Sequence, residues 1–157
     1  KNFGVHFQEV YNLKMSSSTT NSLRFQEPDL NRVKDHFKQF QGGRVILTKD
    51  EDSGVAFICL DHPEKKNSFS GKMMVELNEI ISELQGWKSG KGLILHSKGN
   101  VFCSGVFLDM AKNFLNDPEQ AYWMSFLMQD SCRRFLSLPF ISVALVQGKV
   151  RVFVGDV

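Results

Sequence analysis

The sequence lacks the features of several common protein classes. Its three cysteines lie far apart and form no Cys-x-x-Cys pair, which suits a reducing compartment better than a disulfide-stapled secreted domain. No apolar run approaches the roughly 20 residues that a transmembrane helix needs. The formal net charge is only +2 and the basic residues are scattered, so we expect neither a nucleic acid nor a membrane surface as partner. These absences predict a cytosolic protein.

Motifs for several kinds of active site are also missing. The four histidines show no ligand spacing with one another or with the cysteines, so we expect no metal site. The chain has no phosphate-binding loop, no dinucleotide glycine fingerprint and no Gly-x-Ser-x-Gly around Ser104. Cys103 has no histidine near it in the sequence, and we therefore expect an inert thiol there rather than a nucleophile.

The composition is that of an ordinary globular domain, with 157 residues of which 42% are hydrophobic. The first 27 residues differ from the rest, because Ser, Thr and Asn fill the run 16–22. Such a composition buries too little apolar surface to offset the entropy lost on ordering. Residues 1–27 are therefore predicted to be a disordered leader.

Hydrophobic periodicity predicts the elements that follow the leader. Apolar residues at three- and four-residue steps predict an amphipathic helix that ends at Gly42-Gly43. Two β-rich segments, 44–49 and 54–60, predict a hairpin. Ser70 is expected to cap a helix that stops at Gly86. The apolar face of this helix is predicted to consist of Met73, Leu77, Ile80, Ile81 and Leu84.

The second half of the chain continues the alternation of strands and helices. Gly92 to Leu95 predicts a buried strand, which leads through a polar turn to the small-residue elbow Cys103-Ser104-Gly105 and a short helix from Phe107. Asp117-Pro118 predicts the start of a longer helix. Phe140 to Val146 predicts a strand buried on both faces. The fold class is therefore α/β. The long helix is predicted to pack through Met124, Leu127, Met128, Cys132 and Phe135.

The elbow is the first candidate for chemistry. A helix that starts after it would leave the backbone N–H groups near Ser104, Gly105 and Val106 free, and such groups can hold negative charge. The same residues are also compatible with a plain strand-to-helix turn.

Three segments together resemble the crotonase (enoyl-CoA hydratase/isomerase) superfamily. They are Gly92-Leu93-Ile94-Leu95, Phe102-Cys103-Ser104-Gly105 and the stretch from Pro139 to Gly148. The likeness begins near Asp29 and covers roughly the first half of a family domain. It implies the α/β spiral fold of crotonase/ClpP type, N-terminal half only, in residues 28–148.

Residues 149–157 depart from the family and are expected to form a divergent tail. Val152, Phe153 and Val154 stand where family members have a glycine-rich turn, which carries the second donor of the oxyanion hole. The acid/base segment and the trimer-forming helices follow that turn in the family. We therefore expect a truncated or alternatively spliced product, or a sequence artefact, with little or no activity. An exposed strand edge and marginal stability or aggregation should accompany it.

The resemblance assigns roles to individual residues. The residue after the glycine of the elbow, Val106, is implied to be a backbone donor of the oxyanion hole. Phe107 stands where family members often carry an acidic residue. Lys65 to Phe69 resembles the family's coenzyme-A loop, although solvated surface lysines are an equally simple interpretation. The implied substrate-binding residues are Lys66, Ser68, Phe69, Ser104, Gly105, Val106 and Leu108.

The resemblance also implies an acyl-CoA substrate and no cofactor beyond the coenzyme A that the substrate itself carries. The reaction that it favours is loss of CO2 from a 2-carboxyacyl-CoA, as a clean-up step of fatty acid metabolism. Hydration or isomerisation of an enoyl-CoA is a second interpretation. A non-catalytic fragment that binds CoA or associates with full-length subunits is a third. Family members form homotrimers or hexamers, but the helices that assemble them have no counterpart in this sequence.

Overall fold

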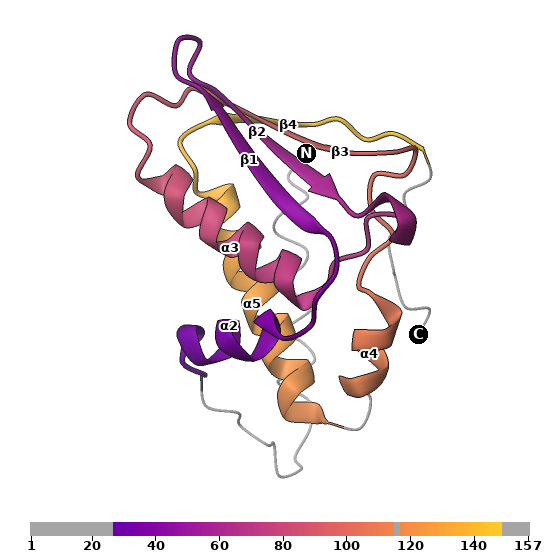
Figure 1. Ribbon diagram of the computed structural model, residues 1–157. Coiled ribbons are helices and arrows are strands. Elements are labelled where there is room, and N and C mark those ends of the chain that lie inside the picture. The colour runs from indigo at the N-terminus through magenta and orange to yellow at the C-terminus, as the bar shows by residue number, and fades with distance from the viewer. Residues whose placement is uncertain (1–26, 115–116, 149–157) are drawn as a thin grey trace, which may run out of the picture.

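The computed structural model describes residues 27–114 and 117–148. They form a four-stranded sheet with helices packed against one of its faces (Figure 1). Residues 1–26 of the predicted leader and the predicted tail at 149–157 lie outside the described residues, so the interpretations of both stay predictions.

The sheet combines one antiparallel and two parallel pairings. Strands β1 (Arg44–Asp50) and β2 (Val55–Asp61) form the predicted hairpin. Strands β3 (Gly92–Ser97) and β4 (Ile141–Ala144) then add in parallel, which gives the strand order β1-β2-β3-β4. Each parallel step requires a helical crossover. The predicted α/β class is confirmed.

Helix α2 (Leu30–Lys38) begins at a side-chain cap. The Asp29 carboxylate accepts a hydrogen bond from the Arg32 N–H at 2.8 Å, a contact worth about 1 kcal/mol. The predicted helix is confirmed, but its predicted end at Gly42-Gly43 is wrong. The helix stops at Lys38 because the Phe40 N–H donates to the carbonyl three residues back, which tightens the last turn.

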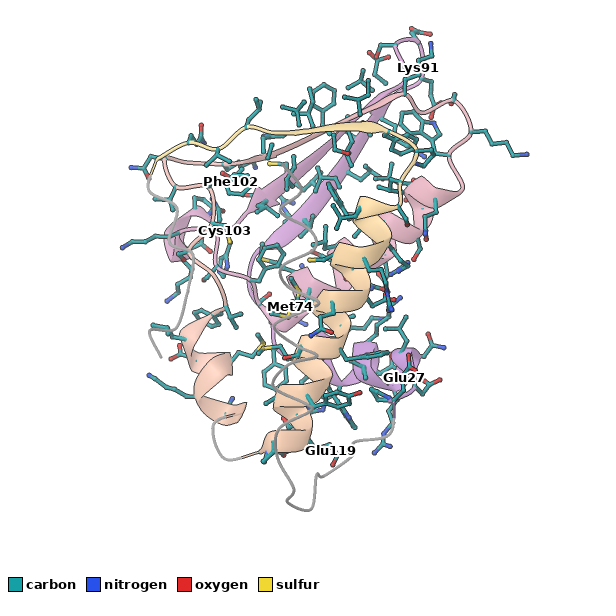
Figure 2. The ribbon with its side chains drawn as sticks, turned by 180° about the vertical axis from the view of Figure 1, so that it is seen from behind. Glu27, Met74, Lys91, Phe102, Cys103 and Glu119 are labelled. Carbon is teal, nitrogen blue, oxygen red and sulfur yellow. The ribbon has the colours of Figure 1, made fainter. Side chains whose placement is uncertain are left out.

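Helix α3 (Gly71–Gln85) is the centre of the core. Ser70 caps it, with Oγ accepting from the Met73 N–H at 3.2 Å, and Gly86 ends it, both as predicted. The predicted single apolar face is incomplete, because α3 lies between the sheet on one side and α2 with the C-terminal helix on the other (Figure 1). Met74, near the middle of the molecule in Figure 2, is consequently as buried as Met73.

Helix α5 (Pro118–Leu136) starts where the sequence predicts. The Asp117 carboxylate accepts from the Gln120 N–H at 3.1 Å, and proline occupies the first turn, where its missing N–H costs nothing. Within the described ranges, no helix combines the length and the apolarity that crossing a bilayer would require.

The predicted packing face of α5 is wrong at one position. Cys132 is exposed, and the neighbouring Ser131 is fully buried against α3 instead. The small serine allows the two helices to approach closely, and its Oγ accepts from Asn78 and donates to the Leu127 carbonyl. A polar residue thus occupies the contact, which apolar periodicity does not reveal.

Strand β4 differs most from its prediction. It is shorter than the predicted range 140–146, and all four of its residues are exposed instead of buried on both faces. Among the described residues β4 is the last strand of the sheet and pairs with β3 alone, so a neighbouring strand covers it on one side and not on the other. Ile141 is 80% exposed and Val143 50%. The predicted exposed strand edge is confirmed.

This edge predicts self-association, since an uncharged apolar strand whose outer backbone groups are unpaired is a template for another chain. We expect Val143→Lys to shift the protein toward monomer, because the charge opposes strand pairing. Size-exclusion chromatography with light scattering measures the effect. Gln129→Lys adds the same charge at an exposed position of α5 and is the control. An equal shift in both variants would attribute the effect to net charge and contradict the role of the edge.

Candidate functional site

The parallel strands bring the predicted site residues to one edge of the sheet. Because β2, β3 and β4 run in the same direction, their carboxyl ends meet there, and ligands of α/β proteins bind outside this edge. Figure 2 shows Phe102 and Cys103 at the end of the sheet opposite Lys91. The loops that gather at this end are 62–69, 98–107 and 145–148.

Two backbone hydrogen bonds join the first two loops. The Phe69 N–H donates to the Gly105 carbonyl at 2.8 Å, and the Phe107 N–H donates to the Phe69 carbonyl at 2.9 Å. They make an isolated parallel bridge between Phe69 and Val106. In such a bridge the N–H of Val106 itself points away from Phe69. Among residues 27–114 and 117–148, none accepts a hydrogen bond from it, so this predicted donor has no protein acceptor there.

The cause of this orientation is not the predicted one. Helix α4 (Leu108–Phe114) begins two residues after Val106, so the elbow does not lie in its first turn. The prediction that the donors lie at a helix start is wrong, because the chain is still extended at Phe107, whose N–H pairs with Phe69. The Gly105 N–H faces the Cys103 sulfur at 3.4 Å. Backbone pairing, not a helix dipole, directs the Val106 N–H.

Gly105 gives the elbow its open corner. Its φ of +94° lies in the region that favours glycine, and a Cβ built there would meet no atom within 4 Å. The glycine is therefore required by the backbone conformation rather than by lack of room. The space beside its Cα is open to a ligand that approaches the Val106 N–H.

The predicted coenzyme-A loop lies directly against the elbow. Its first residue, Lys65, ends the short 3₁₀ helix η1 (Pro63–Lys65), and Lys66 then takes a left-handed conformation with φ 54°. The Lys65 ammonium lies 5.5 Å from the centre of the Phe107 ring, a cation–π contact across the two loops. Lys66 is exposed, and no carboxylate of the described residues forms an ion pair with it.

Ser68 and Phe69 shape the site rather than offer main-chain groups to a ligand. Ser68 is buried; its N–H donates to the Lys65 carbonyl at 3.1 Å, and its carbonyl lies 2.9 Å from Nδ1 of His62, which donates to it. Both main-chain groups of Phe69 are used in the bridge to the elbow. The main-chain groups of Ser68 are therefore not free to make the predicted contact with a nucleotide.

The remaining predicted residues lie on the elbow side. The Ser104 hydroxyl donates to the Lys65 carbonyl at 3.4 Å, a long bond between the two loops. Leu108 is 67% exposed at the start of α4. The predicted set thus falls on two adjacent segments, one on each side of the bridge.

Cys103 has the properties of a structural thiol. It is half-buried, and this burial raises its pKa, which keeps the thiol protonated and weakly nucleophilic. The part of the chain that the structure describes holds no group of three or more His, Cys, Asp and Glu side chains placed to bind a metal.

An ion network supports the same edge of the sheet. The Asp61 carboxylate at the end of β2 accepts from the Lys98 ammonium at 2.7 Å and from the Arg44 guanidinium at 2.9 Å. The hydrogen bond from Lys98, followed by that from Arg44, lowers the pKa of Asp61 despite its partial burial. The network ties the loop after β3 to the strands that precede the candidate coenzyme-A loop.

Sequence reasoning missed Asn67, between Lys66 and Ser68. Its side chain is fully buried and contacts the backbone of the loop that follows β3. Its φ is 53°, a conformation in which asparagine is enriched among non-glycine residues. An asparagine in a polar loop is the only signal that the sequence offers.

Gln147 and Gly148 were predicted only as part of a strand motif, yet they close a third side of the site. The Phe102 N–H donates to the Gln147 carbonyl at 3.0 Å, and Gln147 Nε2 donates to the Ser97 carbonyl at 3.1 Å. A Cβ at Gly148 would lie 1.9 Å from the Asn100 carbonyl oxygen, so only glycine fits. The chain after β4 is thereby held against the loop that carries the elbow.

Two shallow hollows lie elsewhere, along α5. One is lined by Glu27 and Glu119, which lie toward the lower end of the molecule in Figure 2, together with Arg32 and Trp123. The other is formed largely by Tyr122 and other residues of α5. Neither contains a predicted site residue. We assign the site to the elbow because an oriented donor and an open corner coincide there.

A substitution at Gly105 tests the geometry of the elbow. Gly105→Ala places a Cβ in free space but in an unfavourable φ, so we expect a loss of about 1 kcal/mol in unfolding free energy and a shifted Val106 amide resonance. Denaturant unfolding and ¹⁵N NMR measure the two effects. Gly86→Ala is the control, because Gly86 has a helical φ and room for a Cβ. A stable variant with an unmoved Val106 resonance would contradict the assignment.

Comparisons with known proteins identify the relatives of this chain. The family model described as Enoyl-CoA hydratase/isomerase matches residues 50–152. The chain is 48% identical over 118 residues to ethylmalonyl-CoA decarboxylase of Xenopus tropicalis, covering 75% of this chain and 39% of the relative. It is 45% identical over 116 residues to the Homo sapiens protein of that name, covering 74% and 37%. The chain thus spans about two fifths of the length of these relatives.

Solved structures show the same fold. The enoyl-CoA hydratase of Shewanella pealeana superposes with a TM-score of 0.61 at 22% identity, covering 77% of this chain and 43% of that protein. Pseudomonas aeruginosa AtuE superposes with a TM-score of 0.60 at 26% identity, covering 66% and 40%. The predicted crotonase-type fold is confirmed for a partial domain.

Proposed function

The chain belongs to the enoyl-CoA hydratase/isomerase family, and we propose that its elbow binds the thioester carbonyl of an acyl-CoA. We further propose that the protein is of the ethylmalonyl-CoA decarboxylase type, for ethylmalonyl-CoA or methylmalonyl-CoA, with an activity that the replacement of the family's glycines at 152–154 impairs. The names of the relatives at 45% and 48% identity support ethylmalonyl-CoA as the substrate.

The observation that carries the proposal is the orientation of the Val106 N–H, which points away from Phe69. In the decarboxylation, the bond between Cα and the carboxylate breaks, CO2 leaves, and the electron pair moves to the thioester oxygen as an enolate. Cα then takes a proton from solvent. A fixed N–H aimed at that oxygen stabilises the developing charge by about 3 to 4 kcal/mol. Val106 supplies this donor through its backbone, so the valine side chain is no obstacle.

The lysines of the loop suit the other end of the substrate. Lys66 is exposed and free of carboxylate partners among the described residues, whereas Lys98 is paired with Asp61. The phosphates of coenzyme A are anions that an unpaired ammonium can meet. We propose that Lys66 binds them while the acyl end reaches Gly105.

An NMR titration of the ¹⁵N-labelled chain tests the donor. Butyryl-CoA should shift the Val106 amide together with the Lys66 loop, because its carbonyl reaches the elbow. Free CoA has no acyl carbonyl and should shift the loop alone. Lys66→Glu should weaken binding of both, and Lys88→Glu, on an exposed turn, is the control. An unmoved Val106 resonance under saturating butyryl-CoA would refute the proposed donor, and loop shifts without it would support a CoA-binding fragment.

A product assay tests the reaction. We expect little or no turnover of ethylmalonyl-CoA by residues 1–157, because losing one oxyanion donor costs on the order of 10² to 10³ in rate and Val152, Phe153 and Val154 replace the expected glycines. Mass spectrometry follows butyryl-CoA from ethylmalonyl-CoA and 3-hydroxybutyryl-CoA from crotonyl-CoA. Rapid decarboxylation would contradict the expected impairment. Hydration of crotonyl-CoA would favour the enoyl-CoA hydratase interpretation.

Other expectations accompany the proposal. We propose that coenzyme A enters only as part of the substrate and that the protein works in the cytosol. The sequence composition and the family membership support these points.

A further inference from the structure

Asn67 is the most completely bonded side chain at the site. It is fully buried, and its Oδ1 accepts from the His62 N–H at 2.7 Å. Its Nδ2 donates to the carbonyls of Lys98 and Val101, both at 2.7 Å. A side-chain amide has two donor hydrogens and one acceptor oxygen, so every group of Asn67 is used.

These bonds connect the two loops on which the donor depends. His62 belongs to the same loop as Asn67, whereas Lys98 and Val101 belong to the segment between β3 and the elbow. Two residues after Asn67 the first loop reaches Phe69, and four residues after Val101 the second reaches Gly105. Asn67 therefore clamps the loops immediately before they pair.

Beside the bridge, the Lys65 ammonium contacts the Phe107 ring, and Phe69, Val106 and Phe107 pack against the core, but few hydrogen bonds join the two loops. The bridge itself consists of two backbone hydrogen bonds, and the nearby Ser104 hydroxyl reaches the Lys65 carbonyl only at 3.4 Å. A small rotation of either loop would break the pairing and turn the N–H of Val106. The clamp opposes that rotation, because three short bonds to one rigid amide fix both the distance and the angle between the loops.

We propose that Asn67 is a positioning residue that orients the Val106 N–H toward the acyl-CoA carbonyl, an inference that rests on the proposed function of the elbow. Asn67 touches no substrate in this role. Its amide acts through the Phe69–Val106 bridge.

Asn78 provides a matched control for a merely stabilising role. It is also a fully buried asparagine, and its Nδ2 donates to Asp130 and to Ser131, each at 2.9 Å. It belongs to α3, and the hydrogen-bond partners of its side chain are both on α5 rather than on a loop of the site. Replacing either asparagine with alanine removes two donated hydrogen bonds from a buried place, so both should lower the midpoint of denaturant unfolding.

The experiment compares Asn67→Ala with Asn78→Ala in the full ¹⁵N-labelled chain. We expect only Asn67→Ala to shift the Val106 amide resonance and to speed hydrogen exchange of the Phe69 and Phe107 amides, whose hydrogen bonds form the bridge. Only Asn67→Ala should weaken butyryl-CoA binding, by about tenfold for the loss of orientation at one donor. An unmoved Val106 resonance in Asn67→Ala, or an equal shift in Asn78→Ala, would overturn the positioning role.

The two proposals can fail separately. If the wild-type chain does not bind butyryl-CoA, the proposed function fails, while a Val106 shift confined to Asn67→Ala still establishes the clamp. If butyryl-CoA binds equally well to wild type and Asn67→Ala, the function stands and the positioning role falls.

A second variant covers the case in which Asn67→Ala does not fold. Asn67→Asp keeps the shape of the side chain and the acceptor for the His62 N–H, and its carboxylate donates to neither carbonyl. Once protonated at lower pH, its O–H can donate to one of them. We expect the Val106 resonance of this variant to return toward the wild-type position as the pH falls, and the absence of such a return would refute the clamp.

Discussion

The pair of hydrogen bonds between Phe69 and the elbow is the constraint on which the site depends. It joins segments 37 residues apart in the sequence and converts a loose turn into a short extended pairing. Because strand pairing alternates the direction of main-chain groups, the bonds made by Gly105 and Phe107 require Val106 to face the other way. The proposed donor thus results from the pairing of its neighbours.

The rest of the fold supplies rigidity on either side of that pairing. Helix α3 starts directly after Phe69, with Ser70 capping it and its own residues buried between the sheet and the other helices. The second loop is fixed at its base by β3 and by the salt bridge between Lys98 and Asp61. Most of the burial lies in these elements, so the loops themselves need only a few well-placed polar contacts to hold their relative orientation.

The helices and strands were predictable because their signals are local. Features that depend on contacts between distant parts of the chain were not. Ser70 and Asp117 were identifiable as caps because each bonds an N–H only three residues ahead. The exposed side chains of β4 were not predictable from the run itself, because an apolar run looks the same at the centre of a sheet as at its edge. The elbow residues were found through family resemblance, but their helix-start geometry was wrong because the pairing with Phe69 leaves no periodic pattern.

Because the proposed donor is a main-chain group, the identity of the donor residue matters less than the identity of the residues that orient it. Any residue except proline can present an N–H, so the side chain at Val106 is weakly constrained. The strict requirements fall on Gly105, which needs a positive φ, and on Asn67, whose amide shape matches one acceptor and two carbonyls. The proposed function of this elbow therefore depends on residues that never reach the reacting carbon, and the buried amide of Asn67 holds together the loops that direct the Val106 N–H.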